Sequence, residues 1–438
     1  MHRSERNNSM KTKQISTLQL KQDLKYLKKQ YEEYRGKGLN LNISRGLPCK
    51  EQLDLNAEMF HVLDENNCIA EDGTDCRNYG VMYGLSECIR LFSELLDIPS
   101  ENIVLGGESC LNLMYDQFMR YYAFGALGEK PWSMQAMEHE LKWLCPVPGY
   151  DCHFNLTEAL GFRMINIPLL ETGPDMDMVE KLVAQDPTIK GIWCVPQYSN
   201  PTGTVYSDET VERLAKMKTA APDFRIFWDN AYAVHHLYKE HIVKDILKAA
   251  EPYGTTDRIL YFFSTAKITF PGSGVCLMAS GDKTIEETKR LLKLQIFSHD
   301  KLNQLRHVKY LKTPENIMNH MKDIAAILRP RFDMVDEILT QNRLYEDVYT
   351  WIKPDGGYFI TVDSYGGCAK KILKMTEDVG VKVAIPASTY PYHYDPEDTT
   401  IRLAPTYPPM EELKEAMKLF CICANIAAIE KIIEERGI

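Results

Sequence analysis

Four features that would assign the sequence to other classes of protein are missing from it. Across its 438 residues no apolar run approaches the roughly 18 residues of a membrane-spanning helix, and no signal peptide precedes the first helical pattern. Basic residues are the minority, 51 against 61 acidic ones, whereas proteins that bind nucleic acids carry basic surfaces. The 12 cysteines lack the paired spacings of zinc sites or disulfide frameworks. We therefore expect a cytoplasmic enzyme that acts on small molecules and binds no metal, membrane or nucleic acid.

The length of the chain predicts more than one domain, because a single hydrophobic core stops growing beyond roughly 250–300 residues. The first nine residues, MHRSERNNS, are polar, and we expect them to be disordered. A helix is predicted from Thr17 to Tyr34, where apolar residues recur every three or four positions until Gly36. We expect residues 1–62 to form an arm and helix belonging to the smaller domain, residues 63–315 a large domain, and residues 316–438 a small C-terminal domain.

Seven apolar runs alternate with helical patterns in the middle of the chain. This alternation predicts an α/β fold with a mostly parallel, seven-stranded sheet between helices. Ligands of such sheets bind outside the carboxyl ends of the strands, and Ser109, Asn200, Asp229 and Lys267 each follow one run. We expect these four side chains to meet in one crevice. The predicted strands are Asn102–Gly107, Leu141–Pro146, Arg163–Pro168, Ile189–Pro196, Phe224–Asp229, Arg258–Ser264 and Val275–Ala279.

A smaller α+β domain is predicted after the large sheet. A long helix from Asn316 to about Asn342 leads into it, interrupted or kinked at Pro330. The smaller domain is predicted to contain strands at Val348–Ile352, Gly357–Asp363, Lys382–Ile385 and Ile401–Ala404 and helices at Ala369–Val379 and Met410–Glu435.

One lysine occupies an unusual place in the sequence. In YFFSTAKITFPGSGVC, from Tyr261 to Cys276, an apolar run ends at Ser264, and Lys267 follows just before a turn containing proline and glycine. A lysine at the end of a buried strand can extend its amine to solvent. It can also be a desolvated amine that forms Schiff bases. The segment alone leaves both interpretations open.

Three short motifs favour the second interpretation. Asn200-Pro201-x-Gly203, Asp229-x-x-Tyr232 and Ser264-x-x-Lys267 occur in this order. Together they resemble the aspartate aminotransferase superfamily, the fold-type-I enzymes that use pyridoxal 5′-phosphate (PLP). From about Leu39 onward the chain is also similar to the subgroup called type Ic aspartate aminotransferases. That similarity is carried by NISRGLP (Asn42–Pro48), VPGYDCHF (Val147–Phe154), TFPGSGV after the lysine, and IRLAPTYP (Ile401–Pro408).

The resemblance implies a role for each matching residue. Lys267 would hold PLP and move the proton at the substrate Cα, and Asp229 would keep the pyridine nitrogen protonated. Arg402 would bind the substrate α-carboxylate with its planar guanidinium. The expected catalytic residues are Lys267, Asp229 and Tyr232. The expected cofactor-binding residues are these three with Tyr79, Glu108, Ser109, Tyr150, His153, Asn200 and Ser264, and the expected substrate-binding residues are Gly46, Asn200 and Arg402.

Two further implications concern the cofactor phosphate. Gly106-Gly107-Glu108-Ser109 ends a strand and begins a helix, and free N–H groups at a helix N-terminus bind phosphate. Tyr79 matches the tyrosine that reaches the phosphate of the neighbouring subunit, so we expect a homodimer with shared active sites. The family's usual arginine downstream of the lysine is missing, since Ser273 and Gly274 stand at that place. We therefore expect another group, such as Ser273 together with a cation from elsewhere in the chain, to neutralise part of the phosphate charge.

The resemblance leaves three functions to compare. The first is an aminotransferase that moves an amino group between aspartate and 2-oxoglutarate. The second is a PLP-dependent lyase or decarboxylase, which uses the same lysine, aspartate and stacking aromatic residue. The third is a ligand-sensing domain of a transcription factor, but the segment before Asn42 is too short for the DNA-binding domain of such proteins. The partner of the second substrate carboxylate stays open among Arg45, Arg77 and Arg306.

Overall fold

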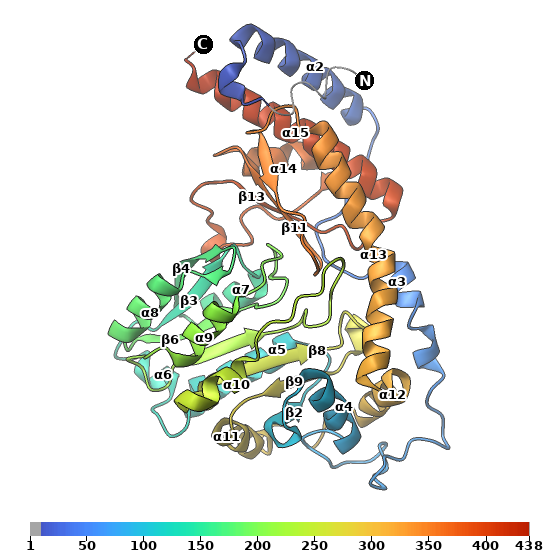
Figure 1. Ribbon diagram of the computed structural model, residues 1–438, viewed down its shortest axis with the longest axis vertical. Coiled ribbons are helices and arrows are strands. Elements are labelled where there is room, and N and C mark those ends of the chain that lie inside the picture. Colours follow the sequence, from blue (N-terminus) through green and yellow to red (C-terminus); the bar gives the residue numbers. More distant parts are fainter. Residues whose placement is uncertain (1–9, 438) are drawn as a thin grey trace.

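The computed structural model describes residues 10–437, so the expected disorder of residues 1–9 lies outside the described residues. Figure 1 shows a broad part that contains the large sheet and a narrower part above it. The long helix α13 (Pro314–Asn342) runs along one side from the broad part to the narrow one.

The large sheet contains the seven predicted strands and one more. They are β2 (Ile103–Leu105), β3 (Lys142–Val147), β4 (Arg163–Leu170), β5 (Gly173–Pro174), β6 (Ile189–Cys194), β7 (Arg225–Asp229), β8 (Ile259–Ser264) and β9 (Cys276–Ala279). Their order is β2-β9-β8-β7-β6-β3-β4-β5. The neighbours from β8 to β4 pair in parallel, whereas β9 and β5 run antiparallel to theirs. The predicted α/β fold class is confirmed, and β5 escaped prediction because two residues carry no apolar pattern.

Helices cover both faces of this sheet. The helices of this part are α4 (Ser86–Leu96), α5 (Cys110–Phe124), α6 (Trp132–Gln135), α7 (Asp151–Ala159), α8 (Met176–Gln185), α9 (Asp208–Lys216), α10 (Ile246–Ala250), α11 (Asp282–Leu292) and α12 (Lys301–Leu311). The short helix α3 (Lys50–Asp54) lies beside α13 instead. Every residue of β6, β7 and β8 is buried, as expected for parallel strands covered on both sides. Phe227 packs against Phe118 of α5, with ring centroids 6.0 Å apart, while its neighbour Trp228 packs against Tyr206, 5.7 Å away. Consecutive residues of one strand thus belong to two hydrophobic cores.

The narrower part is built from short strands and long helices. An antiparallel sheet of β10 (Tyr349–Trp351), β11 (Ile360–Ser364) and β13 (Thr400–Leu403) lies beside α14 (Ala369–Asp378) and α15 (Met410–Glu435). The N-terminal helix α2 (Thr17–Arg35) packs against α15. A separate parallel pair joins β1 (Leu41–Asn42) to β12 (Val381–Lys382). The strand predicted at Lys382–Ile385 is thus shorter and begins one residue earlier, because β1 offers only two residues to pair with.

The long helix α13 is not interrupted at Pro330, which lies inside it. A proline inside a helix removes one backbone hydrogen bond. Here Leu328, Arg331 and Phe332 are all buried on either side of it. Packing of these side chains keeps the helix continuous, and sequence patterns do not report such packing.

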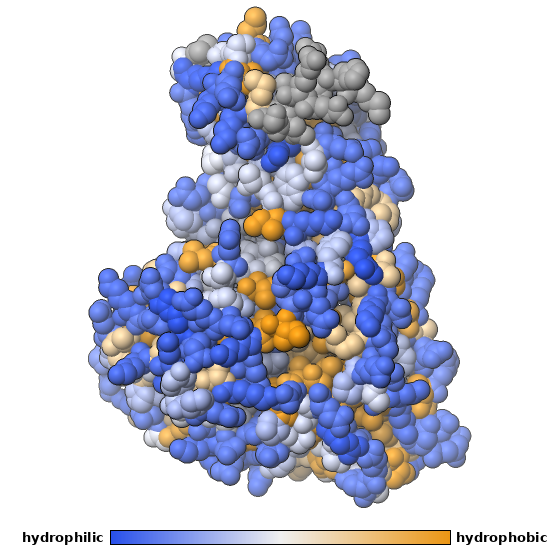
Figure 2. All heavy atoms as spheres, in the orientation of Figure 1, coloured by the Kyte–Doolittle hydropathy of each residue, from blue (hydrophilic) through white to orange (hydrophobic). Residues whose placement is uncertain are grey.

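The surface is mostly polar on the face drawn in Figure 2, with apolar residues gathered near its middle, where the two parts of the molecule meet. Within residues 10–437, none of the helices combines the length and the apolar character needed to cross a membrane.

Candidate active site

A cavity of about 550 Å³ lies where the large sheet faces the narrower part of the molecule. Lys267, Asp229 and Asn200 contribute to its wall from segments that end or follow β8, β7 and β6. Arg402 of β13 and the segment around Gly46 close it from the other side. The predicted crevice at the carboxyl ends of the strands is therefore present. All predicted site residues line it except Tyr79, Glu108 and His153.

Lys267 follows β8 by three residues and extends into this cavity between Tyr232 and Tyr358. Its Nζ lies 5.1 Å from the ring centroid of Tyr232 and 5.7 Å from that of Tyr358. Burial lowers the pKa of the Lys267 amine, and the nearby Asp229 carboxylate opposes this shift. Gln52 of α3 donates a hydrogen bond of 2.9 Å to the Lys267 carbonyl. A fixed backbone thus presents an amine that loses its proton more readily than an exposed lysine.

Asp229 is the last residue of β7 and is only 6% exposed. Its Oδ2 lies 3.2 Å from Nε2 of His153, a buried residue of α7. The imidazole of His153 stacks on Trp193 of β6, with centroids 4.3 Å apart and planes 10° from parallel. His153 therefore lies behind the Asp229 carboxylate and does not line the cavity.

Three further groups surround the space in front of Asp229. Tyr150, at the start of α7, lies edge-on to His153 at 4.9 Å and lines the cavity. Burial raises the pKa of both Tyr150 and Tyr232, so both phenols keep their protons and can donate hydrogen bonds. Asn200 precedes a cis peptide bond to Pro201 and also lines the cavity.

The opposite end of the cavity, near α5, has the features of a phosphate site. Ser109 is the N-cap of this 15-residue helix, and its Oγ accepts a hydrogen bond from the Leu111 N–H. Ser264, at the end of β8, and Cys110 line the same end. Burial raises the pKa of the Cys110 thiol, which therefore adds no negative charge there. Glu108 has an exposed side chain that does not line the cavity.

The turn at Ser273 and Gly274, where the family's arginine is missing, leaves no room for a side chain at Gly274. A Cβ at Gly274 would lie 2.7 Å from the Glu108 carbonyl oxygen, so this backbone accepts no side chain at that position. Asn303 of α12 donates a hydrogen bond of 2.8 Å to the Gly274 carbonyl. Arg306, one turn further along α12, donates a hydrogen bond to the Ser273 hydroxyl. Arg306 thus places a cation beside this turn, although its guanidinium does not line the cavity.

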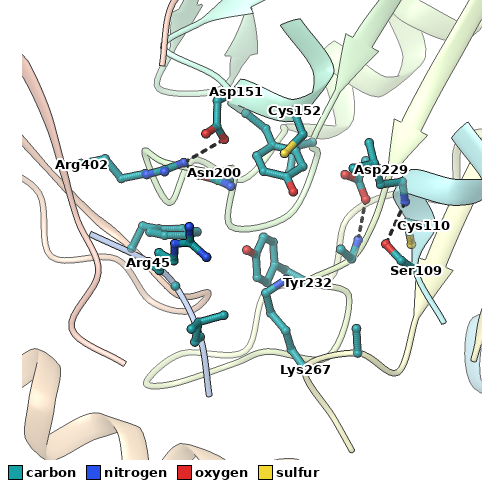
Figure 3. A pocket seen from close by; sticks show the side chains of 18 of the residues that line it. Arg45, Ser109, Cys110, Asp151, Cys152, Asn200, Asp229, Tyr232, Lys267 and Arg402 are labelled. Atoms are coloured by element: carbon teal, nitrogen blue, oxygen red, sulfur yellow. Dashed lines mark hydrogen bonds and ion pairs between the residues drawn. The ribbon is translucent and has the colours of Figure 1, made fainter. Parts of the chain in front are cut away.

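Arg402 lies on the side of the cavity opposite Ser109 (Figure 3). Its Nη1 lies 3.3 Å from Asp151 Oδ1 and 3.4 Å from Asn200 Oδ1. Its guanidinium lies over the ring of Phe359 at 4.9 Å. The same ring excludes a side chain at Gly46, where a Cβ would lie 2.4 Å from the Phe359 ring. Gly46 is therefore needed for close packing, with its backbone at the cavity wall.

Sequence reasoning missed several residues that line the cavity. Asp151 and Cys152 follow Tyr150 directly, and the position of Tyr150 before a helix could have pointed to both of them. No local signal identifies Phe359 or Lys382, because they reach the cavity only through the packing of the narrower part. The missed residues named here are Cys110, Asp151, Cys152, Phe359 and Lys382.

Tyr79 lies outside the cavity of its own chain. Its side chain is 81% exposed, and its ring lies 5.7 Å from that of Phe297, which is also exposed. The expected role of Tyr79 in a neighbouring subunit stays a prediction.

Comparisons with known proteins point to one family of enzymes. A family profile described as aspartate amino-transferase matches residues 15–436. An aspartate aminotransferase of Corynebacterium glutamicum is 40% identical over 406 residues, which cover 92% of this chain and 93% of that protein. The crystal structure of an aspartate transaminase from the same species superposes with a TM-score of 0.92 at 39% identity, covering 95% of this chain and 98% of that one. LysN, an alpha-aminoadipate aminotransferase of Thermus thermophilus, shares the fold at 17% identity, with a TM-score of 0.71 and coverage of 92% and 95%.

Proposed function

The chain belongs to the aspartate aminotransferase family, and on this basis we propose that it moves the amino group of aspartate to 2-oxoglutarate with PLP as its cofactor. Aminotransferases of this fold use PLP. The observation that carries the proposal is one cavity in which the amine of Lys267, the carboxylate of Asp229 and the guanidinium of Arg402 face a common space.

The residues of the cavity fit PLP at each of its functional groups. The N-terminus of α5 with Ser109 and Ser264 would hold the phosphate. Asp229 would bind the pyridine N–H, and its buried position beside His153 suits a charged ring nitrogen. Tyr232 and Asn200 would donate to the ring oxygen, and Tyr150 would cover one ring face. The cation of Arg306, next to Ser273, adds positive charge near the phosphate end.

PLP, when bound, carries the amino group between substrates and takes up the electrons of the broken Cα–H bond. Lys267 is the base that removes this proton and later returns it. Its lowered pKa favours the neutral amine that a base requires. Arg402 orients the substrate by its α-carboxylate, so that the Cα–H bond faces Lys267. Asp151, now 3.3 Å from Arg402, would lose this contact or share it when a carboxylate binds.

The stoichiometry of the first half-reaction tests this proposal. With aspartate and no oxo acid, a transaminase releases one oxaloacetate per active site and stops, because the amino group stays on the enzyme. After the unreacted aspartate has been removed, addition of 2-oxoglutarate should yield one glutamate per site. Continuous product release from aspartate alone would indicate a lyase or decarboxylase instead. A preference for alanine or aromatic donors would keep the transaminase and reject the dicarboxylate substrate.

We also propose a cytoplasmic homodimer. The exposed rings of Tyr79 and Phe297 support a partner at this surface, which would bring Tyr79 to the second phosphate site. All 12 cysteines are unpaired, which suits a reducing compartment. Sedimentation of the wild type beside a Tyr79→Ala variant, with PLP affinity measured for both, tests the shared site.

A further inference from the structure

The second carboxylate of a dicarboxylic substrate needs its own cation, and the three arginines left open by the sequence occupy different places. Arg77 makes a two-pronged contact with Asp75, at 2.9 and 2.7 Å, on the surface and outside the cavity. Arg306 lies behind Ser273 and also stays outside the cavity lining. Arg45 lines the cavity, and its guanidinium points toward the middle of it in Figure 3. The geometry thus separates one arginine from the other two.

The backbone on both sides of Arg45 is held in place. Before it, Ser44 is buried, and both its N–H and its hydroxyl donate to Asn42 Oδ1, at 3.1 and 2.7 Å. After it, Gly46 packs directly on the ring of Phe359, and the Leu47 carbonyl accepts a hydrogen bond of 2.8 Å from the Thr406 hydroxyl. The Arg45 side chain itself is exposed. A fixed backbone with a free side chain is what a ligand-binding cation requires, since the guanidinium is positioned and still available.

A second cation lies on the neighbouring strand. Lys382 of β12 pairs with Asn42 of β1, and the Lys382 carbonyl accepts a hydrogen bond of 2.9 Å from the Ile43 N–H. Lys382 also lines the cavity. Among the described residues the cavity wall therefore carries three cationic side chains, Arg45, Lys382 and Arg402, besides the amine of Lys267, and two carboxylates, Asp151 and Asp229.

The distribution of these charges leaves the substrate end positive. Asp229 faces His153 and Lys267 at the cofactor end, and Asp151 lies beside Arg402. No carboxylate of the described cavity wall remains for Arg45 and Lys382. A substrate with one carboxylate would satisfy Arg402 and leave this positive charge uncompensated, whereas a second carboxylate would neutralise it.

We propose that Arg45 binds the second carboxylate of dicarboxylic amino and oxo acids, and that Lys382 adds positive charge beside it. This inference rests on the proposed aminotransferase function, because it needs Arg402 to hold the first carboxylate. Discrimination then comes from Arg45, since its forked N–H groups match a carboxylate and lose their partner when alanine binds.

The test compares donors that differ by one carboxylate. In the PLP-loaded enzyme, Arg45→Gln should lower kcat/KM for aspartate by about 100-fold and change it for alanine by less than about threefold. Arg45→Lys should recover part of the loss with aspartate, and Arg77→Gln, outside the cavity, is the matched control. A binding measurement without turnover uses the absorbance of the bound cofactor: succinate should bind less tightly to Arg45→Gln, and butyrate should bind as it does to the wild type.

Four results would overturn the inference. Equal losses with aspartate and alanine would mean that Arg45 only shapes the loop. If the wild type prefers aspartate and Arg45→Gln leaves kcat/KM for aspartate unchanged, the role of Arg45 would be rejected and the proposed function would stand. A loss of selectivity in Lys382→Gln alone would assign the second carboxylate to Lys382. A wild type that prefers alanine would reject both the inference and the proposed substrate, and this result is separable because it appears before any substitution.

Discussion

The two ends of the cavity are built in different ways. At the cofactor end Asp229 and Ser264 belong to central strands of a parallel sheet and are 6% exposed each, and Lys267 follows one of those strands. At the substrate end Arg45 and Lys382 are exposed and belong to segments joined by a pair of two-residue strands. The first end is positioned by the core of the molecule, and the second by short contacts near the surface.

This difference separates chemistry from selectivity. Groups held by a packed sheet keep their geometry without a ligand, which is what proton transfer and electrostatic stabilisation require. Exposed cations on or near short strands can adjust to substrates of different length, such as aspartate and 2-oxoglutarate. We therefore expect substitutions at the cofactor end to affect every donor, and those at the substrate end to affect donors selectively.

The largest effect is expected at Lys267. Lys267→Ala should lower transamination of every donor by more than about 10⁴-fold, because the base at Cα is lost. Borohydride reduction of the PLP-loaded wild type should leave a pyridoxyl group on Lys267, located by mass spectrometry of its peptides. A label on another lysine, or none after incubation with PLP, would remove the central assignment.

The next largest effect is expected at Asp229. Asp229→Asn cannot serve as a carboxylate counterion for the pyridine nitrogen, so loss of the Cα proton should slow by about 10²–10⁴-fold. PLP should still bind, as measured by its absorbance after gel filtration. The loss should be the same for aspartate and alanine, as expected for the cofactor end. Near-normal turnover by a fully loaded variant would contradict the role of Asp229.

How far the sequence predicts the structure also differs between the two ends. The strands that carry Asp229 and Ser264 were predictable, because apolar runs and the motifs around them are local in sequence. Phe359 and Lys382 were not, since they meet Gly46 and Asn42 only after the narrower part has folded. For the same reason the sequence could not choose among Arg45, Arg77 and Arg306. The choice depends on which arginine faces the cavity, and that is set by contacts between distant segments.

Arg402 stands between the two ends, and its substitution sharpens the comparison. Arg402→Lys keeps the charge but loses the planar fork, so kcat/KM should fall by about 10- to 100-fold. The loss should be equal for aspartate, glutamate and alanine, because all of them carry the α-carboxylate. Steady-state kinetics with the three donors measure it. A loss confined to aspartate would mean that Arg402 binds the side-chain carboxylate of the substrate, which would contradict the assignment of Arg45.

A smaller effect is expected behind the phosphate end. Arg306→Met removes the cation beside Ser273, so the dissociation constant of PLP should rise about tenfold. Binding of pyridoxal, which has no phosphate, should stay the same within about twofold. Titration of the apoenzyme, followed by absorbance, measures both constants, with Arg77→Met as control. Equal weakening of PLP and pyridoxal would show that Arg306 supports the turn and not the phosphate.

The smallest effect concerns the stability of the cofactor end at low pH. His307 of α12 is fully buried, where its Nε2 lies 3.0 Å from Thr265 Oγ1 and 2.9 Å from Thr269 Oγ1, on either side of Lys267. Burial lowers its pKa from 6.5 to about 4, with Arg306 contributing and Asp300 opposing.

Because the folded-state pKa of His307 is depressed, the unfolded chain takes up a proton first as the pH falls below 6.5. The contribution of His307 to stability is therefore complete above about pH 6.5 and is lost progressively toward pH 4. Between pH 7 and pH 5 the loss of this contribution should lower the free energy of unfolding by about 2 kcal/mol.

Urea unfolding at the two pH values measures the fall in the free energy of unfolding. In His307→Gln this fall should be smaller by the same amount. His61→Gln, at an exposed position, is the control. An identical fall in the wild type and in His307→Gln would mean that His307 takes up its proton over the same pH range in the folded protein as in the unfolded chain. The core around Lys267 would then tolerate charge as the substrate end does.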